Sequence, residues 1–416
     1  MRRPGVALVG LIVVLVFSPA AGAWTKISAG NLENTVDPSV IVLANGKQAI
    51  AYREPKARAV VVIVGGKSRT VASGLAGVGD PQIVQLPNGT LDLFAADQDG
   101  VVSYTSSNGG ATWTGPGKTA SKDTGDVQSA AVRKDGTPIF AQDGTGFLNI
   151  FQGAAGESMH NIFSRCCGYA ESVAVDSHGL AQIAFWSNAS GKSGYLYGKL
   201  GADGSLVGLR TLSAGETVSR DNRVPLVADR KGDAFVSFAN GYPTSSSFMV
   251  ETLHGGATAH KVTLAKGPFS GNEPLMALAV DSASRLWAMW TQGHSVWAAR
   301  SRSAGAHFGA IVHVGEPGSA YQLEAAANAD GSVDAIVNTG SMLQSQRLLP
   351  GLTVQVSTQG VRVLDDGFPV AGATVRAAGK TVKTGADGRA ALGNLPPHTA
   401  VSVTAAGYAP ASGATT

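Results

Sequence analysis

Short runs of alternating apolar and polar residues follow one another along most of the chain, separated by turns rich in Gly, Asn and Asp. One unit recurs: a polar start, an alternating apolar strand, a turn that ends in Gly or Ser, and a second apolar strand. Alternation with a period of two predicts β-strands with one buried face. The first strand and turn of each copy occupy residues 37–46, 80–89, 126–136, 170–179, 223–232, 273–282 and 321–331.

The spacing of these copies predicts how the strands assemble. The turn glycines at 46, 89, 136, 179 and 232 lie 43, 47, 43 and 53 residues apart. Repeats of this length with four short strands are typical of β-propeller blades, whose faces bury one another. Because seven copies are too many for one sandwich, we predict an all-β, seven-bladed propeller over residues 24–351, with six blades as the alternative. We expect residues 24–28 to supply the outer strand of the last blade and close the ring.

The pattern changes near residue 352. Alternating strands joined by Asp-Gly and Pro-containing turns continue over residues 352–412. This pattern predicts a small antiparallel β-sandwich after the propeller. We expect residues 413–416 to form a frayed tail.

The first residues have the features of an export signal. Arg2 and Arg3 precede an uninterrupted apolar segment at 6–17, and the small residues Ala21 and Ala23 stand where a signal peptidase cleaves. The apolar segment is shorter than the roughly 20 residues that a membrane span needs. We therefore predict a signal peptide at residues 1–23, a secreted, extracellular or periplasmic-type location, and no membrane span after cleavage.

Composition narrows the function classes. Charged residues make up 15% of the chain and hydrophobic residues 44%, with 54 glycines, which excludes a disordered polyelectrolyte and a long helical rod. The formal net charge is +3, and the two arginines of the signal contribute to it. This balance gives no electrostatic reason to expect nucleic acid as a partner. We also expect a monomer.

Two turns carry a recognisable motif. In each, a short polar side chain can hydrogen-bond the turn's own backbone, a glycine takes a positive-φ position, and an aromatic side chain packs between blades. The motif residues are Ser106, Asn108, Gly110 and Trp113 in the first turn and Ser301, Gly305 and Phe308 in the second. Both turns resemble the Asp-box of the sialidase (bacterial neuraminidase repeat) superfamily, with Asn108 where the family has Asp. The resemblance covers about residues 24–350 and implies a propeller whose Asp-boxes lie opposite the active site.

The C-terminal segment resembles a second family. It contains Pro369-Val-Ala-Gly-Ala-Thr-Val, a turn at Asp387-Gly388 and a closing Gly407-Tyr408. These features are similar to the carboxypeptidase regulatory-like, transthyretin-like module. The resemblance implies a fold and says little about function, because such modules are appended to many exported proteins.

Catalytic residues are harder to identify. The sialidase resemblance implies three arginines around a carboxylate, a Tyr-Glu nucleophile pair and an Asp acid/base. Tyr52-Arg53-Glu54-Pro55 is similar to that family's aromatic-Arg-Ile-Pro motif, but has Glu in place of Ile and follows a second strand. The eight His residues are scattered without metal-ligand spacing. We predict no catalytic set, no metal and no cofactor, and we favour a non-enzymatic protein over a glycoside hydrolase of sialidase type.

The only two cysteines, Cys166 and Cys167, are adjacent. Adjacent cysteines cannot link distant segments, so they form either a strained vicinal disulfide or two free thiols. An oxidising compartment favours the disulfide. We predict that it is easily reduced, because its ring has little room to relax.

Strand ends on one face of the predicted propeller indicate a binding rim. The first strand of each blade starts on this face and the second returns to it, around the mouth of the axial channel. The predicted rim comprises Asp37, Asp80, Asp126, Trp186, Arg223, Tyr242, Glu273, Trp290 and Tyr321. Aromatic faces and carboxylates suit a sugar, whereas the alternative is that these residues only form turns and pack between blades. We predict an exported binding protein for a neutral or cationic ligand, either a glycan or another extracellular protein.

Overall fold

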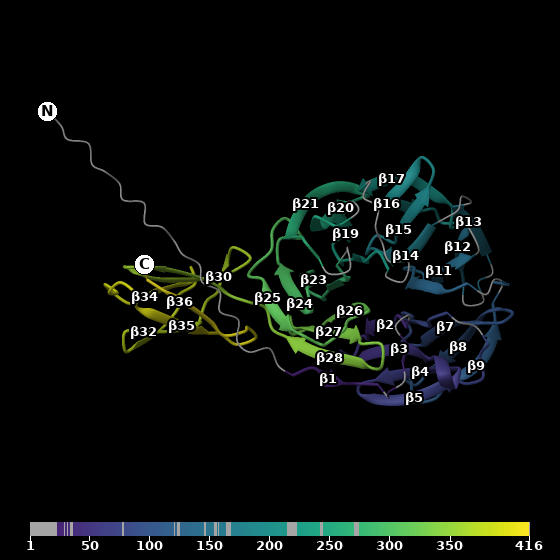
Figure 1. Ribbon diagram of the computed structural model, residues 1–416, viewed down its shortest axis with the longest axis horizontal. Helices are drawn as coiled ribbons and strands as arrows, with labels where there is room; N and C mark the ends of the chain where they lie inside the picture. The colour runs from purple at the N-terminus through teal and green to yellow at the C-terminus, as the bar shows by residue number, and fades with distance from the viewer. Residues whose placement is uncertain are drawn as a thin grey trace.

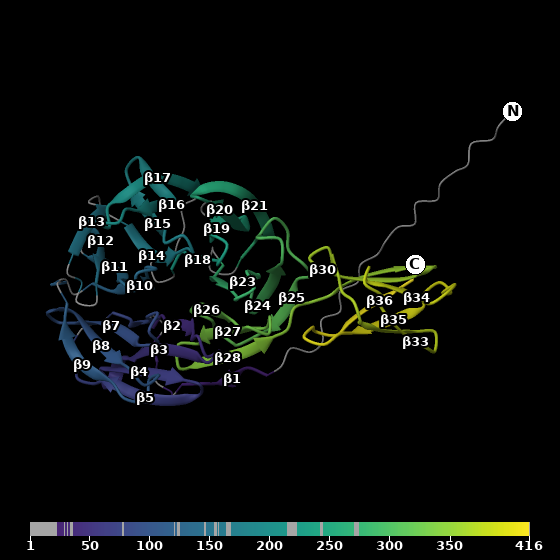
Figure 2. The same ribbon diagram turned by 180° about the vertical axis from the view of Figure 1, so that it is seen from behind.

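A computed structural model of the protein describes residues 23–415, apart from 29, 31, 34–35, 77–78, 120, 123–124, 145–146, 154–155, 157, 164–167, 214–222, 242–243 and 270–273. Seven four-stranded antiparallel sheets, built from β1 to β28, follow one another around a central axis (Figure 1). Two further four-stranded sheets, built from β29 to β36, form a second body beside the ring (Figure 2). The predicted all-β propeller fold is confirmed.

Each propeller sheet contains four strands, ordered from the axis outward. The first strands, nearest the axis, are β2 (Ser39–Val42), β6 (Gln82–Gln85), β10 (Val127–Val132), β14 (Gly168–Val175), β18 (Leu226–Ala228), β22 (Met276–Val280) and β26 (Gln322–Ala327). The second strands are β3 (Gln48–Glu54), β7 (Leu91–Asp97), β11 (Pro138–Gly144), β15 (Ala181–Ala189), β19 (Asp233–Asn240), β23 (Leu286–Gln292) and β27 (Val333–Asn338). The third strands are β4 (Ala59–Val64), β8 (Gly100–Ser106), β12 (Phe147–Gln152), β16 (Lys192–Leu200), β20 (Ser247–His254), β24 (Ser295–Ser301) and β28 (Leu343–Leu348). The outer strands are β5 (Lys67–Ala72), β9 (Thr114–Lys118), β13 (Ser158–Phe163), β17 (Leu206–Ser213), β21 (Ala257–Lys266), β25 (Val312–Gly315) and β1 (Thr25–Lys26).

The seventh sheet joins the two ends of the propeller chain. Its strand order is β1-β28-β27-β26, so its outer strand comes from the start of the chain. Thr25 pairs with Ser345, and the Leu343 N–H donates to Ser28 Oγ at 2.7 Å. The prediction that residues 24–28 close the ring is confirmed.

The turns between first and second strands explain why the repeat folds locally. In the fourth sheet, Asp176 Oδ1 accepts the N–H groups of His178 at 2.9 Å and Leu180 at 3.0 Å. Gly179 then takes a φ of +86°, which residues with a Cβ rarely adopt. In the sixth sheet Ser284 takes the corresponding place at a φ of +59°. An Asp or Asn side chain and a residue at positive φ, usually Gly, therefore mark these turns in the sequence.

Aromatic side chains pack the propeller sheets against their neighbours. Phe94 in the second sheet stacks on Phe140 in the third at a centroid distance of 4.8 Å. Trp290 in the sixth sheet contacts Phe248 in the fifth at 5.3 Å. Large buried side chains of this kind contribute a major share of core stability. They hold the first strands, and hence the residues at their ends, in place around the axis.

The C-terminal body has its own two sheets and apolar core. Its strands are β29 (Thr353–Ser357), β30 (Gly360–Asp365), β31 (Phe368–Pro369) and β34 (Arg389–Ala391) in one sheet, and β33 (Lys380–Lys383), β32 (Thr374–Ala377), β35 (Ala400–Thr404) and β36 (Ala411–Ala414) in the other. The expectation that residues 413–416 fray is wrong as far as Thr415. β36 pairs with β35, and the Thr415 N–H donates to the Thr399 carbonyl at 3.1 Å, so pairing with the second sheet orders this end.

Helices contribute little to the described part of the chain, which contains one short 3-10 turn, η1 (Pro55–Ala57). Within the same residues, no helix has the length and apolarity that crossing a membrane requires.

Candidate functional site

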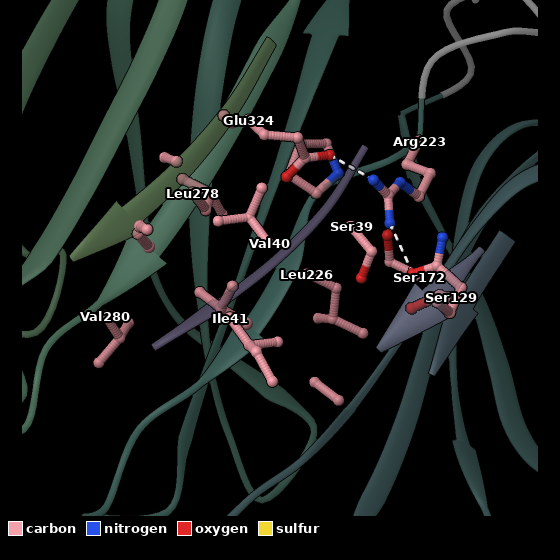
Figure 3. A pocket seen from close by; sticks show the side chains of 18 of the residues that line it. Ser39, Val40, Ile41, Ser129, Ser172, Arg223, Leu226, Leu278, Val280 and Glu324 are labelled. Carbon is pink, nitrogen blue, oxygen red and sulfur yellow. Dashed lines mark hydrogen bonds and ion pairs between the residues drawn. The ribbon is translucent and has the colours of Figure 1, made fainter. Parts of the chain in front are cut away.

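A cavity of about 450 Å³ lies on the propeller axis and is lined by all seven first strands. Asp37, Gln82, Arg223 and Glu324 line one end, which we call the polar mouth. Figure 3 shows the Arg223 guanidinium beside Glu324, with aliphatic side chains such as Val280 farther along the cavity. The cavity therefore combines a charged entrance with an apolar interior.

Arg223 crosses the mouth of the cavity. It precedes β18 in the fifth sheet, yet its Nε and Nη2 form two hydrogen bonds to the Asp37 carboxylate of the first sheet, at 2.8 and 3.0 Å. Its Nη2 also donates to Glu324 Oε1 of the seventh sheet at 2.6 Å. One side chain thus connects three sheets that are far apart in the sequence.

Every N–H of Arg223 has an acceptor within the protein. A guanidinium carries five N–H donors, and this one faces six acceptor atoms. These acceptors are Asp37 Oδ1, Asp37 Oδ2, Gln82 Oε1, Glu324 Oε1 and the carbonyl oxygens of Pro38 and Gln128. Burial lowers the pKa of Arg223, but Asp37 and Glu324 together raise it above its ordinary value. The guanidinium therefore stays charged and has no donor left for a ligand anion.

Glu324 titrates in an unusual range. Burial raises the pKa of its carboxyl, the Arg223 charge lowers it and Asp37 raises it again, and the balance gives a pKa of about 7. The Glu324 side chain is 23% exposed. A carboxyl at the polar mouth can therefore change its protonation near neutral pH.

Asp80 adds a second buried carboxylate next to Asp37. Its Oδ2 accepts the Asp37 N–H at 2.7 Å, and its Oδ1 lies 4.0 Å from Arg53 Nε. Burial raises the pKa of Asp80 well above its ordinary value, and the Asp37 charge raises it further. Arg53 also lines a separate hollow of about 230 Å³ with Glu33 and Arg58.

Glu171 is a fully buried carboxylate. It is 0% exposed, and neither carboxylate oxygen has a hydrogen-bond partner among the described residues. Burial raises its pKa well above the ordinary value, and Asp143 and Asp126 add to the shift. The Asp126 N–H donates to Asp143 Oδ1 at 3.0 Å, which holds the Asp143 carboxylate against the Asp126 backbone.

Electrostatic interactions link six carboxylates on this face, which we call the acidic cluster. Its members are Asp37, Asp80, Asp126, Asp143, Glu171 and Glu324. Among the described residues, Arg223 and Arg53 are the cations that interact with it. Within that part of the chain, negative groups thus outnumber positive ones. Within the described residues, no three or more His, Cys, Asp and Glu side chains are grouped so that they could hold a metal ion.

The structure places the predicted polar rim residues in different surroundings. Asp37, Asp80 and Arg223 meet at the axis, and Asp126 belongs to the same acidic cluster. Tyr321 is 37% exposed at the start of the seventh sheet. Glu273 lies outside the described residues.

The predicted rim tryptophans are buried. Trp290 is 1% exposed and packs between the fifth and sixth sheets, so its assignment to a ligand-binding rim is wrong. Strand β23 directs its side chain between the sheets, whereas the prediction relied only on the end of the strand. Trp186 is 8% exposed and stacks on the half-buried Tyr169 at 6.1 Å, so the exposed edge of this pair belongs to Tyr169. Tyr242 lies outside the described residues.

Two members of the site, Gln82 and Glu324, were missed by sequence reasoning. Gln82 begins the first strand β6 and Glu324 lies inside the first strand β26, whereas the prediction considered only residues that enter first strands. A charged residue inside an otherwise apolar first strand was the available signal for Glu324, because buried charges require a partner.

The two motif turns have much of the predicted internal hydrogen bonding. The Gly110 N–H donates to Ser106 Oγ, and the Gly305 N–H donates to Ser301 Oγ, both at 2.9 Å. Both turns join a third strand to an outer strand, which by strand direction puts them opposite the polar mouth. Trp113 and Phe308 pack against the apolar cores. Cys166 and Cys167 lie outside the described residues, so the vicinal disulfide stays a prediction.

The arginines that a sialidase-type site would gather lie apart. Arg133 donates to Gln152 Oε1 at 2.8 Å, Arg285 pairs with Asp281, and Arg300 pairs with a residue of the C-terminal body. These three side chains are thus used in local contacts away from the polar mouth.

Comparisons with known proteins agree with the fold. No protein-family model and no curated protein matches the sequence. The WD40 domain of Toxoplasma gondii coronin is similar, with a TM-score of 0.50 and 11% identity over 80% of this chain and 88% of that chain. Hydrazine synthase of Kuenenia stuttgartiensis is similar with a TM-score of 0.51 and 13% identity over 76% of this chain and 96% of that chain. WD40 domains are β-propellers, so these similarities support the fold alone, and the sialidase and regulatory-like resemblances stay predictions.

Proposed function

We propose that this chain is an exported binding protein that holds a neutral or cationic ligand, a glycan or a glycan-bearing protein, at the polar mouth. The observation that carries the proposal is the saturation of Arg223 by acceptors of the protein itself. Arg223 would offer an anionic ligand no available donor, and the ligand would meet the acidic cluster. Sugar hydroxyls, or the protonated amine of an amino sugar, would find hydrogen-bond acceptors.

The excess of carboxylates supports a cationic group in the ligand. Burial raises the pKa values of Asp80 and Glu171 because it disfavours their charged forms, and the neighbouring carboxylates of Asp37 and Asp143, respectively, raise them further. Binding a cation next to such groups favours their ionised forms. The half-buried ring of Tyr169, held in place by Trp186, offers an apolar face of the kind that packs on sugar rings.

Glu324 favours a second candidate, a glycoside hydrolase of sialidase type. Its pKa of about 7 lies where a general acid or base works best at neutral pH. The scattered arginines argue against a carboxylate-binding triad, so we rank this function below binding. The substitution Glu324→Gln separates the two, since it would abolish turnover by an enzyme and leave binding of a neutral sugar in place.

A glycan array with the mature protein tests the proposal, using amino, neutral and sialylated sugars with a parallel fluorogenic sialoside assay. We expect binding to neutral or amino sugars and no sialoside turnover. Asp80→Asn keeps the acceptor for the Asp37 N–H and removes the charge, so affinity for amino sugars should fall about tenfold or more.

The matched control is Asp99→Asn, at an exposed position in the loop between β7 and β8 on the same face. It should leave the affinity unchanged. Tighter binding of sialosides than of their neutral counterparts, or sialoside turnover that Arg53→Ala abolishes, would show that the proposed class is wrong.

A further inference from the structure

The two motif turns differ at one position. In the first turn, Asn108 Oδ1 accepts the Thr112 N–H at 2.9 Å and the Ser106 hydroxyl at 3.0 Å, so one amide oxygen serves two donors of the turn. In the second turn the corresponding residue is Ser303, whose shorter side chain accepts the His307 N–H at 3.2 Å. The second turn therefore lacks the amide or carboxylate that this motif normally supplies.

A carboxylate from the C-terminal body enters this turn and accepts further donors of its backbone and side chains. Asp366 Oδ2 accepts the N–H groups of Arg302 at 2.6 Å and Ser303 at 3.0 Å, and the Ser303 hydroxyl at 2.8 Å. Asp366 Oδ1 lies 2.8 Å from His307 Nδ1. The Asp366 side chain is 1% exposed, and its backbone holds a φ of +49°. A conformation that is uncommon for residues with a Cβ thus aims this carboxylate into the turn.

The neighbouring carboxylate forms a second contact between the two bodies. Asp365 pairs with Arg300 of β24, with side chains that are 1% and 3% exposed. The Tyr408 hydroxyl donates to Asp365 at 3.1 Å, and the Arg302 guanidinium lies 5.0 Å from the centre of the Phe368 ring. Figures 1 and 2 both show β30, which ends at Asp365, beside β25 of the ring.

We propose that the turn at residues 301–308 is a binding site for an aspartate carboxylate, and that Asp366 occupies it to dock the C-terminal body onto the propeller. The turn has donors without a carboxylate of its own, and the C-terminal body has a carboxylate that its own fold does not use. Separating a buried charge pair leaves an uncompensated buried charge. Separation of the two bodies at this contact is therefore unfavourable. The inference does not depend on the proposed function.

Docking at this turn has a geometric consequence. The turn lies on the face opposite the polar mouth, so the C-terminal body leaves the mouth open. The two bodies then move as one unit, and the C-terminal body presents its remaining surface in a fixed direction.

Hydrogen exchange and small-angle X-ray scattering on the full chain test the proposal. Asp366→Ala should speed exchange of the Arg302 and Ser303 amides about tenfold or more, as expected when a hydrogen bond to a charged group is lost. The same variant should increase the radius of gyration, because the C-terminal body swings away from the ring.

A second variant changes the propeller side of this contact. Ser303→Asp places a carboxylate in the turn next to Asp366, and repulsion between the two should undock the C-terminal body. Asn108→Asp makes a similar change in the first turn and should leave scattering unchanged. Unchanged scattering and unchanged amide exchange in both Asp366→Ala and Ser303→Asp would overturn the proposal.

Discussion

Arg223 connects the first, fifth and seventh sheets through one side chain, and the geometry of its guanidinium makes this possible. A lysine would keep the charge but could not form the two parallel bonds to Asp37 or reach the remaining acceptors. We expect Arg223→Lys to lower the free energy of unfolding by about 2–4 kcal/mol, measured by urea denaturation. Arg389→Lys serves as the control, because Arg389 and Asp387 are 69% and 64% exposed, and it should change stability by less than about 0.5 kcal/mol.

Glu324 gives a prediction about pH. Its ordinary pKa is 4.5 and its pKa in the folded protein is about 7, so the folded state retains a proton that the unfolded chain releases earlier. Its stabilising contribution is complete below about pH 4.5 and is lost as the pH rises through 7. Glu324→Gln keeps an acceptor for Arg223 and cannot titrate. The stability of the wild type relative to this variant should therefore fall by up to about 3 kcal/mol between pH 4.5 and 8, and a constant difference across this range would refute the assignment.

Trp290 illustrates a residue whose role depends on its burial. Because it is 1% exposed and packs on Phe248, Trp290→Ala should lower the free energy of unfolding by about 3–5 kcal/mol. Ligand affinity of the protein that remains folded should change little. Tyr321→Ala removes an exposed aromatic side chain. It should change the free energy of unfolding little and weaken glycan binding measurably. If Trp290→Ala abolished ligand binding at unchanged stability, Trp290 would belong to the binding site.

At the level of strands and turns, local chemistry made the repeat predictable. An Asp or Asn together with a closing Gly fixes six of the seven turns, and alternation fixes which face of a strand is buried, so both are readable from neighbouring residues. The contacts of the site are not local: Arg223 and Asp37 are 186 residues apart in sequence. Periodicity placed them on the same face but could not show which carboxylate the guanidinium would bind, nor that Trp290 would point between sheets.

The pairing of β1 with β28 joins the two ends of the propeller chain. Ser28 Oγ accepts the Leu343 N–H at 2.7 Å, and Ser28 is 7% exposed. Ser28→Ala leaves this buried donor without its partner, which should cost about 1–3 kcal/mol. Hydrogen exchange should accelerate most at the amides of β28. An equal loss of protection in all seven sheets would show that the joint has no special role.

For the whole molecule, ring closure constrains where an export signal could be removed. β1 begins at Thr25, and Trp24 packs against the core of the last two sheets. Cleavage after Ala23 would leave both residues in place, whereas cleavage beyond Ser28 would remove the strand that closes the ring. We therefore predict that the mature protein starts at Trp24, as N-terminal sequencing and intact-mass measurement of the secreted form would show. A secreted protein that starts after Ser28 and still unfolds with the stability of the longer form would contradict both the predicted cleavage site and the role given to β1.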